Sequence, residues 1–423
     1  MHASIRERIS PDTEIDGILG GETYRWNADA EFGAGATVTY SFVTQDSQFS
    51  TDPDTGYGPS TEDEAPWRGR TELTATQKAN VRLAVASWAA VANIRFREVS
   101  DLSGTPGQIR FGRTDSSGDG ETAAFAYYPG ENPYDGDVWF CNPVMGDSDW
   151  EPGSYDFSTA VHEIGHALGL KHPFDAEETG VTLPAARDVV TVTQMSYSVL
   201  PGDEWSEMSY MSTTPMDIDI RAIQFLYGAN TRTGAGNTTY RFSQGQALCQ
   251  SIWDAGGTDT IIYQATRDAC RIDLRPGNWS DLGANLTFTG EEDDAVVQQP
   301  STVFLPRNVT IENATGGGGN DRLIGNDAAN VLAAAAGNDT LTGGRGNDTL
   351  DGGAGADTAV FSSRAAAYTV RPAGTGAVRV TGPDGSDLLR GIERLRFGAA
   401  ASVPLASLLG RSRPVGGLLA VGY

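Results

Sequence analysis

The sequence is poor in cysteine and has no long apolar run. Three cysteines in a chain of 423 residues are far too few for a disulfide framework, and their odd number allows one bridge at most. No stretch approaches the ~18 consecutive apolar residues of a membrane span, and residues 1–21 lack the apolar core of a secretory signal peptide. We therefore predict a soluble protein with neither a membrane span nor an N-terminal export signal.

Positive charge is also scarce. Thirty lysine and arginine residues stand against 55 aspartate and glutamate residues, which leaves a formal net charge of −25. This balance argues against nucleic acid or an anionic membrane as a partner and favours the binding of cations. Glycine, by contrast, is abundant at 52 residues, and most of the excess lies after about residue 230. The composition therefore changes along the chain, as expected for two domains.

The residue pattern divides the chain into four parts. Residues 1–21 are polar and end in two glycines, which predicts a leader or a short pro-segment rather than a folded element. Residues 22–230 contain both helical and strand-like apolar patterns, whereas residues 231–404 contain short strand-like runs between glycine and aspartate turns. The apolar tail 405–423 follows. We therefore predict an α+β domain followed by an all-β domain.

Helices and strands are expected to alternate in the first domain. Helical spacing of apolar residues is found at residues 73–94, 157–169 and 215–227. Strand-like runs are found at residues 36–43, 94–99, 108–111, 122–128 and 137–140.

Residues 161–173 read V-H-E-I-G-H-A-L-G-L-K-H-P. On a helix, His162 and His166 share one face about one turn apart, so two imidazoles can bind one ion. Gly169 can adopt the left-handed conformation that ends a helix and directs His172 back toward the ion as a third ligand. Glu163 is then placed to act as a general base on a water molecule and to pass the proton to a leaving amine. The pattern predicts one catalytic Zn²⁺ in a site for peptide hydrolysis.

An isolated H-E-x-x-H motif is about as often a surface helix as a metal site. The extended form found here is much rarer, and three of the four histidines in the chain fall within eleven residues. A structural role for core histidines explains this clustering poorly, so we favour the metal site.

The extended zinc motif usually comes with a methionine-containing turn beneath the metal. The sequence offers two candidates, Met195-Ser196-Tyr197 and Met208-Ser209-Tyr210, of which one can serve. The methionine would form an apolar floor under the imidazoles, and the phenol two residues later could bind zinc or stabilise an oxyanion.

Together these residues resemble the serralysin family, which consists of secreted bacterial zinc metalloproteases of the metzincin clan. The resemblance covers most of the chain, and the matching segments occur in the order found in the family. It implies a metzincin-like catalytic domain followed by a calcium-binding parallel β-roll. Besides the zinc motif, the similar segments are Gly21–Trp26, Pro152–Tyr155, Ala222–Asn230 and Trp253–Thr260.

The resemblance also implies roles for individual residues. It implies zinc ligation by the three histidines, catalysis by Glu163, and Tyr197 as a retractable fifth ligand. It favours Met195 as the structural methionine, because residues 191–194 are similar to the segment that leads into that turn. In the family a strand edge beside the cleft pairs with extended substrate through its backbone. The matching segment is 122–128, with Ala124, Ala126 and Tyr128.

A nine-residue repeat of the form G-G-x-G-x-D-x-U-x, where U is a large apolar residue, occupies residues 316–360 in five turns. Glycine turns offer backbone carbonyl oxygens and aspartates offer carboxylate oxygens, which are the ligands that Ca²⁺ prefers. The recurring leucines are expected to point inward and form a thin core. A flexible glycine-rich linker would not keep aspartate and leucine in phase. We predict several structural calcium ions bound by Gly317, Gly319, Asp321, Gly337, Asp339, Gly344, Gly346, Asp348, Gly353, Gly355 and Asp357.

The second and third turns depart from the repeat. Asn330 replaces an aspartate, and Ala334 and Ala335 replace both leading glycines, so we expect one ion site to be lost or weakened there. The resemblance implies further calcium ligands near the domain junction. These are Asp254, Gly256, Gly257, Asp259, Asp281, Thr310 and Glu312.

The three cysteines allow one specific disulfide hypothesis. Cys249 and Cys270 lie in strand-like runs on either side of a turn, so a bond between neighbouring strands can form after secretion. Cys141 is expected to be a buried, small apolar residue.

The leading functional hypothesis is an extracellular zinc endopeptidase that acts on flexible protein chains as a monomer. Family members leave Gram-negative cells through a type I secretion machinery, which makes that machinery an expected partner. The tail 405–423 is the candidate signal, and its alternative is a packed final strand. Two other functions remain open: a calcium-dependent binding protein with an inactive zinc domain, and a zymogen inhibited by residues 1–20. The intact Glu163 argues against an inactive domain.

Overall fold

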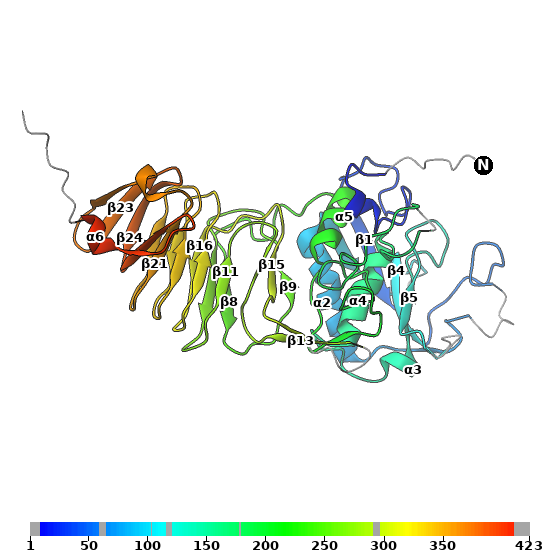
Figure 1. Cartoon of the computed structure of the whole chain (residues 1–423). Coiled ribbons are helices and arrows are strands. Elements are labelled where there is room, and N and C mark those ends of the chain that lie inside the picture. The colour runs from blue at the N-terminus through cyan, green and yellow to red at the C-terminus, as the bar shows by residue number, and fades with distance from the viewer. Residues whose placement is uncertain are drawn as a thin grey trace, which may run out of the picture. The chain divides into compact units, whose positions relative to one another are not determined.

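The computed structural model describes residues 9–58, 65–102, 104–115, 121–176, 179–290 and 297–409. These residues form two compact units (Figure 1). The first contains the chain up to residue 233 together with segments 247–255 and 285–306, and the second contains the rest. The first unit mixes helices with a sheet and the second is built of strands, so the predicted fold class is confirmed. The sequence pattern places one break near residues 228–236, whereas the chain returns twice to the first unit.

The first unit contains a six-stranded sheet. Its strand order is β3-β1-β4-β6-β5, and β2 pairs with β4. Strands β3, β1, β4 and β6 run parallel, while β5 runs antiparallel to β6 at the end of the order. The bounds are Ala36–Phe42 (β1), Arg70–Thr71 (β2), Ile94–Glu98 (β3), Ile109–Thr114 (β4), Ala124–Ala126 (β5) and Val138–Cys141 (β6).

Two long helices of the first unit, α2 (Ala75–Val91) and α4 (Tyr155–Ala167), contact each other (Figure 1). The indole Nε1 of the fully buried Trp88 donates to the backbone oxygen of Val161 at 3.0 Å, which fixes α2 against α4. Helix α4 begins two residues earlier than the predicted start, because Ser154 caps it. The other elements of this unit are Thr13–Asp16 (α1), Asn142–Met145 (α3), Asp217–Tyr227 (α5), Glu207–Met208 (β7), Gln250–Ser251 (β9), Leu286–Thr289 (β13), Val297–Gln299 (β14) and Val303–Leu305 (β15).

The N-terminal segment is folded from at least residue 13, so the prediction of an unfolded leader up to residue 21 is wrong for this part. Asp12 caps the short helix α1 by accepting from the backbone N–H of Glu14. Ile18 and Leu19, which follow the helix, are fully buried. The polar residues and the two glycines suggested a boundary, but the apolar side chains between them belong to the core.

The second unit contains a parallel roll made of two sheets (Figure 1). Successive repeats contribute strands alternately to the two sheets, so each strand pairs with the strand 18 residues further on, as in Leu323 with Leu341 and Leu332 with Leu350. These four leucines and Ala359 are at most 1% exposed, which confirms the predicted inward core.

The strands of the roll and of its ends share two sheets. One has the order β22-β23-β24-β20-β18-β16-β10-β8 and the other β11-β17-β19-β21-β25-β26. The bounds are Thr239–Ser243 (β8), Thr260–Gln264 (β10), Arg271–Asp273 (β11), Asn313–Thr315 (β16), Arg322–Ile324 (β17), Val331–Ala333 (β18), Thr340–Thr342 (β19), Thr349–Asp351 (β20), Thr358–Phe361 (β21), Thr369–Pro372 (β22), Ala377–Gly382 (β23), Gly385–Arg390 (β24), Arg394–Phe397 (β25) and Val403–Pro404 (β26). Strand β12 (Asn278–Ser280) belongs to neither of these two sheets.

The proposed disulfide bond is absent. Cys141, Cys249 and Cys270 are all buried free thiols. The Sγ of Cys249 lies 3.2 Å from the Oγ of Ser212, and the backbone N–H of Cys270 donates to Asp321. Cys141 is fully buried in β6, as predicted for a small apolar residue.

The C-terminal tail is described only at its start, where residues Leu405–Leu409 form helix α6. Residues 410–423 of the candidate secretion signal lie outside the described residues. None of the helices in the described ranges is both long enough and apolar enough to cross a membrane.

Candidate metal centre

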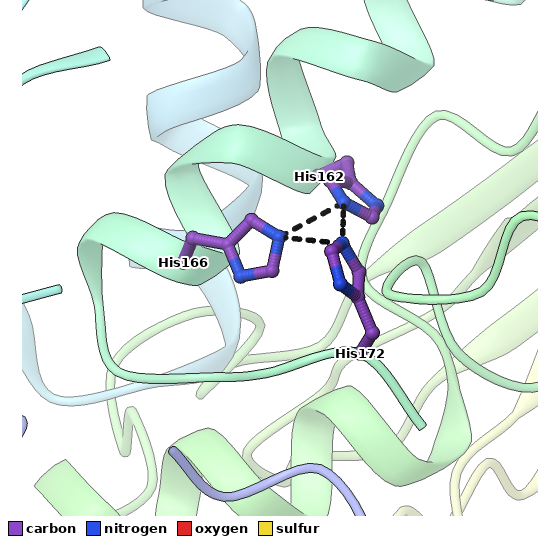
Figure 2. Close-up of side chains that lie close together, drawn as sticks. All are labelled: His162, His166 and His172. Carbon is purple, nitrogen blue, oxygen red and sulfur yellow. Dashed lines mark hydrogen bonds between the residues drawn. The ribbon is translucent and has the colours of Figure 1, made fainter. Parts of the chain in front are cut away.

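Three histidine side chains converge on one point at the end of α4 (Figure 2). His162 and His166 lie one turn apart on α4, and His172 lies on the loop that follows. Gly169 has φ +105° where the chain leaves the helix, the left-handed conformation that was predicted for the turn. The Nε2 atom of His166 lies 3.0 Å from those of His162 and His172, and the latter two lie 3.2 Å apart. The spacing in the sequence therefore predicted this cluster correctly.

The protein backbone fixes how two of the imidazoles are oriented. The Nδ1–H of His162 donates to the backbone oxygen of Gln194, and the Nδ1–H of His166 donates to that of Leu170, both at 2.7 Å. With the protons on Nδ1, the Nε2 atoms of these two rings turn lone pairs toward the same point. Without an ion these lone pairs repel one another, whereas a cation placed at that point would be coordinated by them.

Burial keeps the three rings uncharged. It lowers the pKa of His162 to about 4, and together with the neighbouring charges of His162 and Lys171 it lowers the pKa of His172 to about 3. The pKa of His166 is also well below its ordinary value because of burial. Three neutral nitrogen donors with short contacts are the donor set of zinc sites in which a fourth position stays open. The residues present therefore fit a zinc ion.

Glu163 follows the first histidine on α4 and is buried, at 5% exposure. Its Oε2 atom is buried and has no hydrogen-bond partner among the described residues. Burial raises the pKa of Glu163 to about 8, which is the cost of placing a carboxylate in this site without a neighbouring cation. A divalent ion beside it would lower that pKa again.

Of the two candidate methionine turns, the first lies at the histidines. Met195 is fully buried, and its Sδ would lie only 2.5 Å from a Cβ at Gly165 of α4, so the helix and the methionine are in close contact. Two residues later, the hydroxyl of Tyr197 donates to Nε2 of His172 at 2.8 Å. Met208 instead lies in β7, opposite Phe288 of β13.

A buried carboxylate that the sequence analysis missed holds this turn in place. Asp219 of α5 is fully buried and accepts from the N–H of Gln194 at 2.7 Å, the N–H of Met216 at 2.8 Å and the hydroxyl of Thr193 at 2.6 Å. Because the oxygen of Gln194 accepts from His162, Asp219 supports a ring of the metal centre through one residue. No local motif marks it, since it lies within an apolar helical stripe.

The predicted substrate-binding edge also lies near the histidines. Strand β5, with Ala124 and Ala126, contacts α4 and ends the strand order of its sheet. Tyr128 lies two residues beyond it, with its ring 4.7 Å from that of Tyr24 and 6.0 Å from that of His166.

In the roll, two successive nine-residue repeats make one coil of 18 residues. Acidic side chains of successive coils form two ladders of hydrogen bonds. In the first, each backbone N–H donates to the carboxylate one coil further on: Asp321 to Asp339 at 2.7 Å and Asp339 to Asp357 at 2.8 Å. In the second, Asn330 donates to Asp348 at 2.9 Å. The Oδ2 atoms of Asp339, Asp348 and Asp357 are buried and have no hydrogen-bond partner among the described residues.

Two ladder residues lie outside the repeat and were missed. The N–H of Asp357 donates to Glu393 at 2.8 Å, and that of Asp348 donates to Asp387 at 3.0 Å. The inserted strands β22 and β23 move these acids away from the nine-residue spacing, so periodicity alone could not reveal them. Each ladder thus continues beyond the last repeat.

Burial raises the pKa of several ladder carboxyls, to about 7 for Asp348 and about 6 for Asp339 and Asp387. Neighbouring negative charges add to this shift for Asp348 and Asp339. Across the described part of the chain, the three histidines are the one cluster of three or more histidine, cysteine or acidic ligands. A calcium ion in the roll would therefore need backbone carbonyl oxygens as well as these carboxylates. The unsatisfied buried oxygens fit such an ion.

The remaining predicted calcium ligands differ in their surroundings. Asp254 and Asp259 are buried, and the N–H of Asp259 donates to Glu312 at 2.7 Å. Thr310 is exposed and lines a pocket together with Arg275 and Asp327. Asp281 forms an antiparallel bridge with Arg271, and the predicted glycine ligands Gly317 and Gly319 do not have positive φ. The remaining predicted glycine ligands have positive φ, as does the substituted Ala335; they are Gly256, Gly257, Gly337, Gly344, Gly346, Gly353 and Gly355.

A helix and its exit loop that bring three histidines together over a buried methionine, in a chain that continues into a parallel β-roll, define a metzincin-type metallopeptidase. Comparison with known families agrees. Residues 68–185 match the Matrixin family, and residues 216–388 match the family described as Peptidase M10 serralysin C terminal.

Comparison with individual relatives indicates which family within this class the chain resembles. Serralysin B of Dickeya chrysanthemi is 36% identical over 321 residues, which cover 71% of this chain and 60% of the relative. Metallopeptidase AprA of Pseudomonas marginalis is 36% identical over 346 residues, covering 74% of this chain and 65% of the relative. Serralysin of Proteus mirabilis is 33% identical over 348 residues, covering 74% and 64%. The aligned part of the chain thus spans about 60 to 65% of the length of these relatives. The chain belongs to the serralysin type of metzincin metallopeptidases.

Proposed function

We propose that the protein is a zinc endopeptidase that hydrolyses peptide bonds of protein substrates, with Glu163 as the general base. One observation carries this proposal: three imidazole Nε2 atoms lie within 3.2 Å of one another at the end of the helix that carries Glu163. The buried Oε2 atom of Glu163 has no hydrogen-bond partner within the described ranges. His162, His166 and His172 are the zinc ligands in this proposal.

His162, His166 and His172 would hold a zinc ion here, which would act as a Lewis acid toward a water molecule and the scissile carbonyl. Glu163 accepts the proton of the attacking water on its free Oε2 atom and later delivers it to the leaving amine. The buried surroundings suit both steps, because they raise the proton affinity of the carboxyl and exclude competing water. A more exposed carboxylate would hold the proton too weakly to return it.

Tyr197 assists in this proposal without transferring a proton. Its hydroxyl lies 2.8 Å from Nε2 of His172, so it can occupy a ligand position at rest. Its side chain is 50% exposed, which leaves room for it to swing aside and donate a hydrogen bond to the developing oxyanion. Met195 forms the apolar floor beneath.

Substrate binding is assigned to the free edge of β5. An extended peptide would pair with the backbone at Ala124 and Ala126, and Tyr128 would lie beside it. Small side chains at this edge leave the peptide's own side chains unhindered, so we expect broad sequence tolerance.

The roll is proposed to bind several structural calcium ions through its ladder carboxylates and glycine carbonyls. Calcium binding would couple folding of the roll to calcium-rich surroundings. Following the family resemblance, we also propose secretion through a type I machinery and action as a monomer. Two statements stay predictions from the sequence: that the C-terminal tail acts in secretion, and that the first 20 residues are a pro-segment.

Hydrolysis of casein in millimolar calcium tests the proposed activity. The unchanged chain is compared with Glu163→Gln, with the exposed control Glu151→Gln, and with a zinc-chelated sample, while bound zinc is measured in each. We expect Glu163→Gln to retain zinc and lose at least about 100-fold in kcat, and Glu151→Gln to keep full activity. A zinc-loaded chain that cleaves nothing would refute the proposal and favour a calcium-dependent binding protein.

A further inference from the structure

The N-terminal segment caps the helix that carries the metal ligands. The last carbonyl groups of a helix have no partner within it and must be satisfied from outside. At the end of α4, the indole of Trp26 donates to the oxygen of Ala167 at 2.8 Å, and the N–H of Gly20 donates to the oxygen of Gly169 at 2.9 Å. The segment is therefore bonded to the helix end between His166 and His172.

The same segment then pairs with the loop that leads to His172. Leu19 forms an antiparallel bridge with Leu170, and the N–H of Lys171 donates to the oxygen of Ile18 at 2.8 Å. Ile18, Leu19 and Leu170 are fully buried, so apolar contact reinforces these hydrogen bonds.

The side chain of Lys171 joins the two pieces of chain. Its ammonium group is fully buried and donates to the backbone oxygens of Gly17 at 2.8 Å, His172 at 3.2 Å, Asp175 at 2.5 Å and Val181 at 3.0 Å. One of these oxygens belongs to the N-terminal segment and three to the metal-binding loop. A compact ammonium group can donate in three directions at once, which suits a cage of carbonyl oxygens.

The choice of lysine is unusual for this chain. The sequence contains 28 arginines and only two lysines, Lys78 and Lys171. Planar guanidinium groups elsewhere bind carboxylates, as Arg110 does with Asp101. A guanidinium at position 171 would be too wide for a cage closed by four backbone oxygens.

Ion pairs hold the other end of the segment. Arg221 of α5 pairs with Asp12 and with Glu14, and Arg187 pairs with Glu14 at 2.8 Å. The segment is thus attached at both ends, and its middle lies against the loop of His172.

We propose that residues 10–20 form a permanent strap that positions His172, that Lys171 is the positioning residue at its centre, and that the strap is not a removable inhibitor. This inference rests on the proposed zinc ligation by the three histidines. Loss of the strap would release the loop, and the third ligand would no longer be held against the other two.

Zinc affinity of the full chain in millimolar calcium, measured by competition with a chromophoric chelator, tests the proposal. We expect Lys171→Met to weaken zinc binding by about 10- to 100-fold, as removal of support for a metal ligand does. Lys78→Met removes the other lysine, which lies on α2 away from the cage, and should change nothing. Unchanged affinity in Lys171→Met would overturn the inference.

A second comparison separates positioning from general loss of structure. In a His172→Ala background, Lys171→Met should weaken zinc binding no further, because the ligand that it positions is already gone. Equal weakening in both backgrounds would show that Lys171 acts on the fold as a whole and would contradict the proposal.

Truncation tests the strap itself. A variant without residues 1–8 should bind zinc normally, whereas a variant without residues 1–20 should bind it at least about 10-fold more weakly. In the variant without residues 1–20, Lys171 should also become reactive toward an amine-acylating reagent, while of the two lysines of the full chain only Lys78 should react. Full zinc affinity and protease activity after removal of residues 1–20 would identify a pro-segment instead. Zinc affinity is measured separately from casein hydrolysis. A chain whose zinc affinity depends on the strap but that cleaves no casein would therefore refute only the proposed protease activity.

Discussion

The metal centre of the first unit and the ladders of the second prepare for their ions in opposite ways. Burial removes charge from the histidines, and backbone oxygens hold two of the rings in place whether or not an ion is present. In the roll, burial leaves carboxylate oxygens of Asp339, Asp348 and Asp357 without partners and raises the pKa of those groups. The comparison teaches that the histidine donors are oriented before a metal binds, whereas the roll keeps buried carboxylate oxygens that the proposed calcium ions would satisfy.

One turn of the roll provides an internal control for this contrast. The side-chain polar atoms of Asn330 and its neighbour Asn326 are all satisfied without an ion. Its Nδ2 donates to the oxygen of Glu312 at 2.9 Å and to Oδ1 of Asn326 at 3.0 Å, and its Oδ1 accepts from the N–H of Asn326 at 2.9 Å. Asn326 in turn donates to the oxygens of Leu274 at 3.0 Å and Ile311 at 2.8 Å. The hydrogen bonds of this amide pair thus satisfy groups that, in the neighbouring coils, the proposed calcium ions would satisfy.

Removal of calcium should break the contrast most strongly. Each ion present at about 100 times its Kd stabilises the bound form by about 2.7 kcal/mol, so loss of several ions should expose the roll. We expect amide hydrogen exchange in strands β19 and β20 to speed up by at least about 100-fold in chelator, while α4 stays protected. Equal loss of protection in both would contradict independent roles for the two kinds of site.

Asn330→Asp should make the stability of the turn around Asn330 dependent on calcium. The change replaces two donated hydrogen bonds by repulsion between oxygens, which should cost about 1–3 kcal/mol without metal, measured by thermal unfolding in chelator. Added calcium should restore most of that loss. The matched change Asp348→Asn should have the reverse signature, a smaller calcium response with no loss of metal-free stability. A variant Asn330→Asp that is insensitive to calcium would show that this turn lacks the carbonyl ligands.

Acid should affect the metal-free and calcium-bound roll in opposite directions. Asp348, Asp339 and Asp387 have folded pKa values of about 6 to 7, above the value of an unfolded aspartate, so the folded state binds protons more tightly. In chelator the Tm of the roll should therefore rise as the pH falls from 8 to 5. With calcium it should fall over the same range, because protons compete with the ion. A Tm independent of pH in chelator would contradict the assigned burial of these carboxyls.

Ala335→Gly should give the smallest effect. Ala335 has φ +75°, a left-handed conformation that a residue with a Cβ adopts at a cost of about 1–2 kcal/mol. Glycine at this position should raise the free energy of unfolding by up to about 1 kcal/mol, measured in denaturant at saturating calcium. Its neighbour Ala336 has no such conformation, so Ala336→Gly should lower stability by about 0.5–1 kcal/mol.

How much the sequence could predict follows from the range of the interactions involved. The spacing of His162, His166 and His172 along one helix and its exit is local, and so is the phase of the leucines in the roll, so both were predicted. The support of the Gln194 turn by Asp219 and the capping of α4 by Trp26 join distant segments and leave no local pattern. At residues 13–19 composition even gave a wrong prediction of an unfolded leader, because the polar residues there are interspersed with apolar side chains that belong to the core.

The ladders of the roll have a direction. Every rung is a backbone N–H that donates to an acid further along the chain. The last acceptors lie beyond the repeats, Asp387 in β24 and Glu393 immediately before β25. Each coil therefore depends on its C-terminal neighbour for hydrogen-bond acceptors, and the stack is a one-dimensional array of nearest-neighbour interfaces. Loss of a coil at the start of the array removes one such interface, whereas loss of the segment with Asp387 and Glu393 leaves the backbone donors of Asp348 and Asp357 without these acceptors.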